Sequence, residues 1–132
     1  DKSMMVAAPA PAPAPAPMMA KAKTWEVQFQ FDSTTMLGDA SAKLKEAVAY
    51  VSKFKRPRIT IAGYTDTSGA AAYNKELSAR RSEAVAISSM DMGLDPKNVI
   101  MRSYGEEKLK SPTADGVKKQ ENRRATITVE SK

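Results

Sequence analysis

Two charged side chains with the spacing of a strand–turn–helix unit are the clearest candidates for chemistry in this sequence. Asp66 lies in the glycine-flanked turn "GYTDTSG", and Arg81 is the second of two adjacent arginines in the stretch "YNKELSARRSEAV" that follows. In such a unit the strand's end and the helix's first turns lie side by side, so the two groups can be close. Either they form a structural ion pair, or they flank an open cleft in which the arginine binds a carboxylate.

The helix expected over residues 72–91 directs Arg81 inward and Arg80 outward. At 100° per residue, Arg81 falls inside an apolar arc formed by Tyr73, Leu77, Ala84 and Val85. Arg80 lies at the edge of this arc, with glutamates three and four residues away as surface partners. Arg81 has no such acid, and a buried guanidinium without a partner is costly. We therefore expect Arg81 either to meet a carboxylate from elsewhere in the fold, with Asp66 as the nearest candidate, or to line an open cleft that receives one.

Alternating and helical periodicities predict the elements that must position this pair. Strands are expected over residues 25–31, 58–64, 98–104 and 123–129, and helices over residues 35–54 and 72–91. One face of the first strand is expected to carry Trp25, Val27, Phe29 and Phe31, and the cap of the first helix is expected to be Asp32, Ser33 or Thr34. Each strand has one apolar face. The order strand, helix, strand, helix, strand, loop, strand therefore predicts a two-layer α/β sandwich, with a four-stranded mixed sheet and helices on one face.

The composition excludes several kinds of site. The chain of 132 residues contains neither cysteine nor histidine, which removes disulfides, thiol nucleophiles, Cys/His zinc sites and the commonest general base. No glycine-rich nucleotide-binding motif follows a strand, so we expect no enzyme activity, cofactor or metal. The formal net charge of +6 favours an anionic partner, such as nucleic acid, anionic lipid or an acidic polymer.

The N-terminal stretch differs from the rest of the chain. Residues 7–17 alternate alanine and proline, which predicts an extended, semi-rigid spacer, so we divide the chain into a linker over residues 1–20 and a domain over residues 21–132. No apolar run is long enough to cross a membrane, and no signal peptide is evident. Because the sequence begins at Asp1, we expect a mature product or a fragment.

Four stretches give the sequence a family resemblance: "FQFDSTTM", "ITIAGYTDTSG", "YNKELSARRSEAV" and the pair "SYGEE" and "ENRRATITV". Together they resemble the peptidoglycan-binding domain at the C-terminus of outer membrane protein A, which peptidoglycan-associated lipoprotein and flagellar stator proteins share. The resemblance covers residues 25–130. The Ala-Pro stretch is similar to the hinge that joins such domains to an outer-membrane barrel.

The resemblance implies a binding site for the diaminopimelate residue of the peptidoglycan stem peptide. In the family, the turn aspartate and the helix arginine hold this residue, and these positions are Asp66 and Arg81 here. The remaining positions that match the family's site are Thr65, Asn74, Leu77, Phe31 and Asp32. The resemblance also implies a periplasmic domain of an outer-membrane protein, fused to or anchored by a barrel, that tethers the membrane to the cell wall. It leaves a homodimer open.

Two segments are given a lesser role. The loop over residues 105–121 is basic in its second half, and we assign it no role beyond solubility or contact with an anionic polymer. The two cysteines that some relatives have in this loop are absent, so no disulfide supports it. In "ENRR", Arg123 or Arg124 is expected to form a structural ion pair.

Two other classes of function compete with peptidoglycan binding as interpretations of this sequence. A single-stranded nucleic-acid binder could stack bases on the aromatic side chains of the first strand, although these are also that strand's only large core residues, and the RNP1 pattern is missing. A hydrolase would need a Ser/Lys pair or two carboxylates, and no such constellation is present. We therefore predict no nucleic-acid partner.

Overall fold

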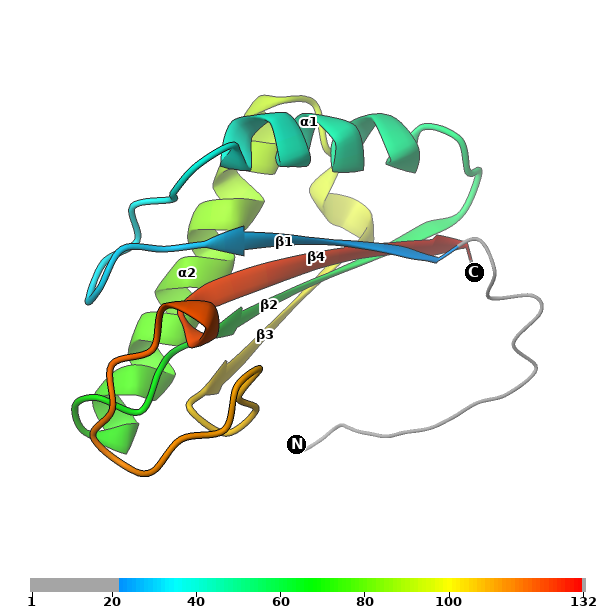
Figure 1. The fold of residues 1–132 in the computed structure, drawn as a ribbon. Coiled ribbons are helices and arrows are strands. Elements are labelled where there is room, and N and C mark those ends of the chain that lie inside the picture. Colours follow the sequence, from blue (N-terminus) through cyan, green and yellow to red (C-terminus); the bar gives the residue numbers. More distant parts are fainter. Residues whose placement is uncertain (1–21, 132) are drawn as a thin grey trace.

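The computed structural model of the chain describes residues 22–131 as one mixed sheet with two helices packed on it (Figure 1). The elements, in chain order, are β1 (Lys23–Gln28), α1 (Ala40–Val51), β2 (Pro57–Tyr64), α2 (Ala71–Asp91), β3 (Val99–Gly105) and β4 (Arg124–Ser131). Two short 3-10 helices, η2 (Pro96–Asn98) and η3 (Gln120–Asn122), precede β3 and β4. This order matches the predicted one and confirms the α/β class.

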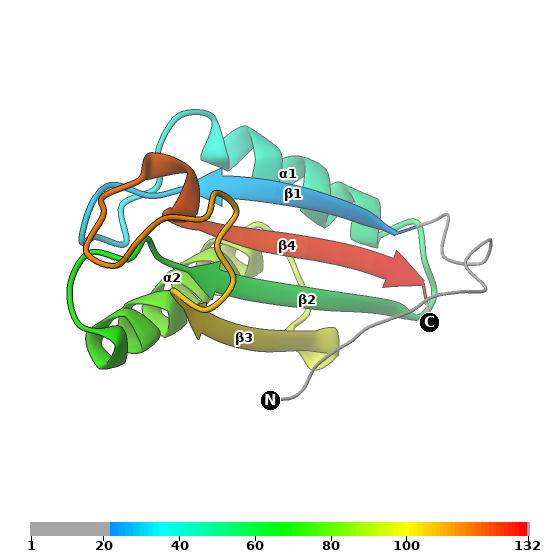
Figure 2. The same ribbon diagram turned by 60° about the horizontal axis from the view of Figure 1, so that its bottom comes forward.

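The sheet has the strand order β1-β4-β2-β3. The last strand, β4, lies between β1 and β2 and runs antiparallel to both, whereas β2 and β3 are parallel and joined by α2. Both helices cover the same face of the sheet (Figures 1 and 2). The ends of β1 and β2 and the start of β4 therefore meet at one end of the molecule, which is where the predicted site residues lie.

The core lies between the sheet and the helices, and β4 shows how the sequence specifies it. Ala125, Ile127 and Val129 alternate along this strand and are fully buried, while the threonines between them face away from the core. Leu44 and Ala47 of α1 pack against this layer as part of one buried apolar cluster. The strict alternation of apolar and polar residues in the sequence therefore correctly predicts which side of the strand contacts the helices.

Helix α2 lies unusually close to β2 and β3 because the facing residues are small. A Cβ atom at Gly63 would lie 1.9 Å from the backbone oxygen of Ser78, so no side chain fits at that position. The Ser78 hydroxyl also accepts a hydrogen bond of 2.9 Å from the N–H of Gly105. These contacts hold the first half of α2 against the ends of both strands.

The first strand and the first helix are shorter than predicted. β1 ends at Gln28, and only Phe29 continues the pairing, through an isolated bridge to Met36. Phe31 was expected in the strand's buried face but is 46% exposed. α1 begins at Ala40 and its cap position is Asp39, without a side-chain hydrogen bond, so the predicted capping by residues 32–34 is wrong. The cause is a tight loop closed by the hydrogen bonds from Gln30 N to Thr35 O and from Leu37 N to Gln28 O, both backbone to backbone.

The N-terminal part of the sequence is not covered by this description. The division into a linker over residues 1–20 and a domain from residue 21 stays a prediction, because residues 1–21 lie outside the described residues. Within residues 22–131, neither α-helix combines the length and the apolar composition needed to cross a bilayer.

Candidate functional site

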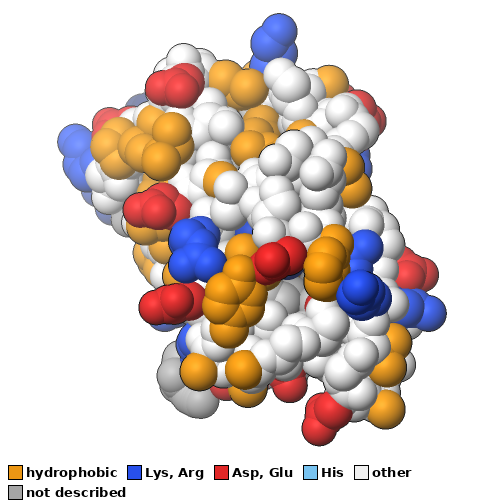
Figure 3. Space-filling view, turned by 90° about the vertical axis from the view of Figure 1, so that its left-hand side faces the viewer, with side chains coloured by type: hydrophobic (Ala, Val, Ile, Leu, Met, Phe, Trp, Pro, Cys, Tyr) orange, Lys and Arg blue, Asp and Glu red, His pale blue; other side chains and the backbone are white. Residues whose placement is uncertain are grey.

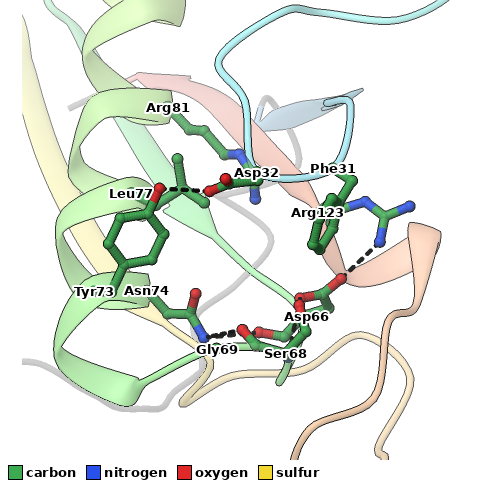
Figure 4. Close-up of a pocket in the computed structure, with 10 residues that line it drawn as sticks. All are labelled: Phe31, Asp32, Asp66, Ser68, Gly69, Tyr73, Asn74, Leu77, Arg81 and Arg123. Atoms are coloured by element: carbon green, nitrogen blue, oxygen red, sulfur yellow. Dashed lines mark hydrogen bonds and ion pairs between the residues drawn. The ribbon is translucent and has the colours of Figure 1, made fainter.

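A pocket of about 160 Å³ opens at the end of the sheet where β1 and β2 finish. Its walls come from the loop after β1, the turn after β2, the first half of α2 and the residue before β4. The lining residues are Phe31, Asp32, Asp66, Ser68, Gly69, Tyr73, Asn74, Leu77, Arg81 and Arg123. Figure 4 shows these side chains around a common opening, with Tyr73 and Asn74 on the α2 side and Phe31 and Arg123 opposite. Figure 3 looks onto this end of the molecule, where acidic, basic and apolar side chains gather near the centre of the view. Six of the seven predicted site residues line this pocket, and the exception is Thr65.

Arg81 is fully buried, as its position on the helix predicted, but its partners are not carboxylates. Its Nε, Nη1 and Nη2 atoms donate hydrogen bonds of 2.9, 2.9 and 3.1 Å to the backbone oxygens of Ser33, Tyr64 and Gln30. Arg81 therefore joins α2 to the end of β2 and to the loop after β1. Of the two alternatives, the direct ion pair with Asp66 is not formed, because these carbonyls already bind the guanidinium.

These three bonds leave two N–H groups of the buried Arg81 without a hydrogen-bond partner among the described residues. A guanidinium has five N–H donors, and the three bonds use one on each nitrogen, which leaves one N–H on each Nη atom. Burial lowers the pKa of Arg81 to about 10, so the group is still protonated at neutral pH. A buried, fixed, positively charged donor pair beside an open pocket suits a carboxylate ligand.

Asp66 is only 3% exposed, and its carboxylate accepts four hydrogen bonds. Its Oδ1 accepts from the N–H and the hydroxyl of Ser68, and its Oδ2 accepts from the backbone N–H of Lys119. Oδ2 also accepts a charge-assisted bond of 2.6 Å from Nη1 of Arg123. Burial by itself would raise the pKa of Asp66, but these hydrogen bonds outweigh it and hold the pKa below its ordinary value. The carboxylate is therefore negatively charged at neutral pH.

This lowered pKa makes Asp66 a source of pH-dependent stability. A carboxyl whose pKa is lower in the folded chain stabilises the fold fully above its unfolded pKa, about 3.9, and this contribution is lost as the pH falls through the folded value. We expect the free energy of unfolding, measured in denaturant between pH 6 and pH 2, to drop below about pH 4. The drop should be smaller in Asp66→Asn, and an equal drop in both proteins would show that Asp66 does not contribute.

The turn that carries Asp66 packs against the loop over residues 105–121, for which the sequence predicts no such role. The Thr67 hydroxyl donates to the oxygen of Ala114 and accepts from the N–H of Val117, and the N–H of Gly116 donates to the oxygen of Thr67. This loop therefore closes over the turn by backbone contacts. The expectation that it serves only solubility or polymer contact is corrected in this respect.

Thr65 and Asn74 mainly hold the turn that carries Asp66 in place through hydrogen bonds. Thr65 is buried, its N–H donates to the oxygen of Gly105, and its hydroxyl donates to the oxygen of Asp66. The Asn74 amide donates to the oxygen of Ser68 and to Oε1 of Glu106. Asn74 thus ties α2 to the turn while one side of it still faces the pocket.

Two exposed aromatic rings form the rim of the pocket. Tyr73 is 44% exposed, which corrects its predicted place in the buried arc of the helix, and its hydroxyl donates to Oδ1 of Asp32. On the other side, the Phe31 ring lies 4.4 Å from Nζ of Lys118 and 5.5 Å from the guanidinium carbon of Arg123. The rim therefore combines aromatic surface with charges of both signs.

Several pocket residues were not singled out as site residues from the sequence. Arg123 was predicted to form a structural ion pair, which its bond to Asp66 confirms, and Arg124 forms one with Glu26 at 3.1 Å. That Arg123 also lines the pocket depends on a contact between residues 57 positions apart, which no local spacing signals. Ser68 and Tyr73 lie within the quoted stretches "GYTDTSG" and "YNKELSARRSEAV", so their proximity in sequence to Asp66 and Asn74 was a signal for both.

The arrangement provides a charged cavity but no apparent metal centre. Within residues 22–131, no group of three or more acidic, histidine or cysteine side chains could hold a metal ion. A buried carboxylate and a buried guanidinium line one solvent-open pocket. The fold and the pocket together define a small α/β domain with a pocket lined by buried charges at the end of its sheet.

The chain belongs to the OmpA family, whose sequence model matches residues 28–123. The crystal structure of the peptidoglycan-associated lipoprotein from Burkholderia pseudomallei superposes with a TM-score of 0.72 at 30% sequence identity, over 79% of this chain and 88% of that one. The peptidoglycan-associated lipoprotein of Rhizobium meliloti is 35% identical over 101 residues, which is 76% of this chain and 57% of that protein. Outer membrane porin F of Pseudomonas fluorescens is 29% identical over 106 residues, 80% of this chain and 32% of that protein.

These comparisons confirm the predicted family and also show a difference in length. The chain spans about a third of porin F and little more than half of the Rhizobium lipoprotein. The shared part is the domain described here. The functions of the unmatched parts of those proteins therefore do not transfer to this chain.

Proposed function

We propose that this domain binds peptidoglycan non-covalently through the diaminopimelate residue of the stem peptide. The observation that carries the proposal is that Asp66 and Arg81, buried and oppositely charged, line the same solvent-open pocket. The family membership supports it, because two of the relatives above are named peptidoglycan-associated lipoproteins. The nucleic-acid alternative gains no support, since Trp25 and Phe29 are buried on the helix side of the sheet.

The chemistry of the ligand fits the two ends of the pocket. The free end of diaminopimelate carries an ammonium and a carboxylate on one carbon. The ammonium donates to Asp66, displacing or sharing the oxygen that Arg123 contacts at 2.6 Å. The carboxylate accepts from the two Nη–H groups of Arg81 that its backbone partners leave free. Because Arg81 is already fixed by three hydrogen bonds, little side-chain entropy is lost on binding.

The proposed role in the cell combines the pocket with the Ala-Pro stretch that precedes the domain in the sequence. A pocket of this size holds one amino-acid end, so one contact need not be tight, but peptidoglycan repeats the ligand and a tethered domain gains from effective concentration. We propose that the chain is the periplasmic domain of an outer-membrane protein, tethered by the Ala-Pro stretch to a barrel or another anchor. It acts by binding rather than catalysis. A homodimer stays a prediction.

The specificity of binding tests this proposal. We expect soluble diaminopimelate-type stem peptide to bind the chain, and lysine-type peptide, which lacks the second carboxylate, to bind about 100-fold more weakly because Arg81 would lose its charged partner. Calorimetric titration of the two peptides in the same buffer measures the ratio. Equal affinities would show that the second carboxylate is not recognised and would contradict the proposed role of Arg81.

A further inference from the structure

The end of the sheet opposite the pocket carries an exposed cluster of cations. β1 and β2 begin there, and α1 and β4 end there (Figures 1 and 2). The strand register confirms the placement, because Lys23 is paired with Val129 and Arg58 with Glu130. We refer to this cluster as the basic pole, and its members are Lys23, Lys53, Lys55, Arg56 and Arg58, all exposed.

These five charges are not neutralised within the described part of the chain. Across residues 22–131, none of them takes part in an ion pair, although surface cations elsewhere, such as Lys75, Arg80 and Lys110, each have an acidic partner. The acids nearby are Glu130, opposite Arg58 on β4 but forming no ion pair, and Glu46, which accepts from Nε1 of Trp25. Among residues 22–131, the basic pole therefore retains a net positive charge that no acidic side chain neutralises through an ion pair.

Aromatic rings lie between the cations of the basic pole. Nζ of Lys23 lies 5.3 Å from the Trp25 ring and 5.6 Å from the Tyr50 ring, and Nζ of Lys53 is also 5.6 Å from the Tyr50 ring. Both lysines also border a groove of about 340 Å³. The ring of Phe54, which is partly exposed, packs edge-on against Tyr50 at 5.1 Å. The Trp25 ring is buried, but the Tyr50 ring is partly exposed between the two lysines. Long cationic side chains and tyrosine rings both favour the headgroup level of a bilayer.

We propose that the basic pole binds the surface of a bilayer that contains anionic phospholipid. The described residues begin just before β1 at this end, and the pocket lies at the other end. A domain held on a surface from its N-terminal side therefore presents the cations to that surface and the pocket away from it. That this surface is the outer membrane rests on the proposed function. The attraction to lipid headgroups rests on the charges alone and is tested without peptidoglycan.

Vesicle binding by the complete chain tests the proposal. The probe is large vesicles of 30% phosphatidylglycerol and 70% phosphatidylcholine, compared with pure phosphatidylcholine, in a co-sedimentation assay at low salt. We expect binding to the anionic vesicles only, and loss of binding above several hundred millimolar salt because the charges are screened. At about five-fold per basic residue, Lys53→Glu/Lys55→Glu/Arg56→Glu should lower the partition coefficient by about 100-fold or more.

A triple variant with the same change in net charge is the matched control. Lys75→Glu/Arg102→Glu/Lys108→Glu lies away from the basic pole and should lower partitioning by about ten-fold or less, through net charge alone. Asp66→Asn changes the pocket but not the basic pole, so it should bind vesicles as the unchanged chain does. Vesicle binding can therefore succeed or fail independently of the peptidoglycan proposal. Equal losses in the two triple variants, or no preference for anionic vesicles at low salt, would overturn the proposal. So would a basic-pole variant that loses binding to peptidoglycan sacculi but not to vesicles.

Discussion

Replacement of Arg81 by alanine should lower the free energy of unfolding by about 3–5 kcal/mol, because it leaves buried polar groups without partners. Three backbone oxygens, those of Gln30, Ser33 and Tyr64, lose their donor at once. Arg81 is also the largest fully buried side chain, so its removal leaves a cavity beside Phe29. This loss is a large share of the 5–15 kcal/mol that stabilises a typical domain.

The same reasoning separates the structural role of Arg81 from its role in binding. Arg81→Lys keeps the positive charge but cannot reach three carbonyls in three directions, so we expect it to lose about 2–3 kcal/mol and most of the peptide affinity. Arg80→Ala is the matched control, since Arg80 forms an exposed ion pair of 3.6 Å with Glu76 and lies 5.8 Å from the exposed Tyr73 ring, and its loss should cost about 1 kcal/mol or less. Denaturant unfolding of the four proteins measures the series. An Arg81→Ala chain as stable as Arg80→Ala would show that the three carbonyls do not depend on Arg81.

Replacement of Asp66 by asparagine should reduce the affinity for diaminopimelate-type peptide by about 100-fold or more. The change removes the negative charge that receives the ligand ammonium. It also leaves Arg123 without its acid, and the freed guanidinium then repels an ammonium placed beside it. Calorimetric titration measures the loss.

The loss of affinity has to be distinguished from a loss of folding. Asparagine keeps an oxygen for the Ser68 donors but turns an N–H₂ group toward Lys119 or Arg123, so we expect about 1–3 kcal/mol less stability as well. The titration is therefore made at a temperature where circular dichroism shows the variant folded. Glu107→Gln is the control, because it is the same kind of change at an exposed residue outside the pocket, and it should bind as the unchanged chain does. Unaltered affinity in Asp66→Asn would remove Asp66 from the binding site.

The sequence predicted the inward direction of Arg81 but not what it holds. The direction follows from the residue types three and four positions away, which helical geometry places around it. Its partners are backbone oxygens. Because every residue has one, residue types in the sequence do not indicate which oxygens Arg81 contacts. Two of these oxygens belong to the loop after β1, where Asp32 has a φ of +50° and the chain reverses before α1. A conformation uncommon for a residue other than glycine is not visible in a periodicity pattern.

The strands and helices themselves were predictable to within a few residues, with one exception. β2, α2, β3 and β4 agree with the predicted ranges within two residues. Buried apolar residues alternate along β2 and β4, whereas most buried side chains of α2 are polar, and Ile100 and Met101 of β3 are exposed. The segment from Phe29 to Asp39 was divided between a strand and a helix because its apolar residues fit both patterns. Long-range backbone bonds and the pairing of Phe29 with Met36 decided its structure. The same holds for the loop over residues 105–121, whose contacts with the Asp66 turn are mostly through backbone atoms.

Titration of the ¹⁵N-labelled chain with diaminopimelate-type stem peptide is the most direct test of the binding site. If the two buried charges receive the zwitterion, the largest amide shifts fall on residues 64–82 and around Lys119 and Arg123, and the Nε–H signal of Arg81 moves. Lysine-type peptide at the same concentration leaves these signals nearly in place. Shifts that cluster elsewhere, with these signals unmoved at saturation, would contradict the account.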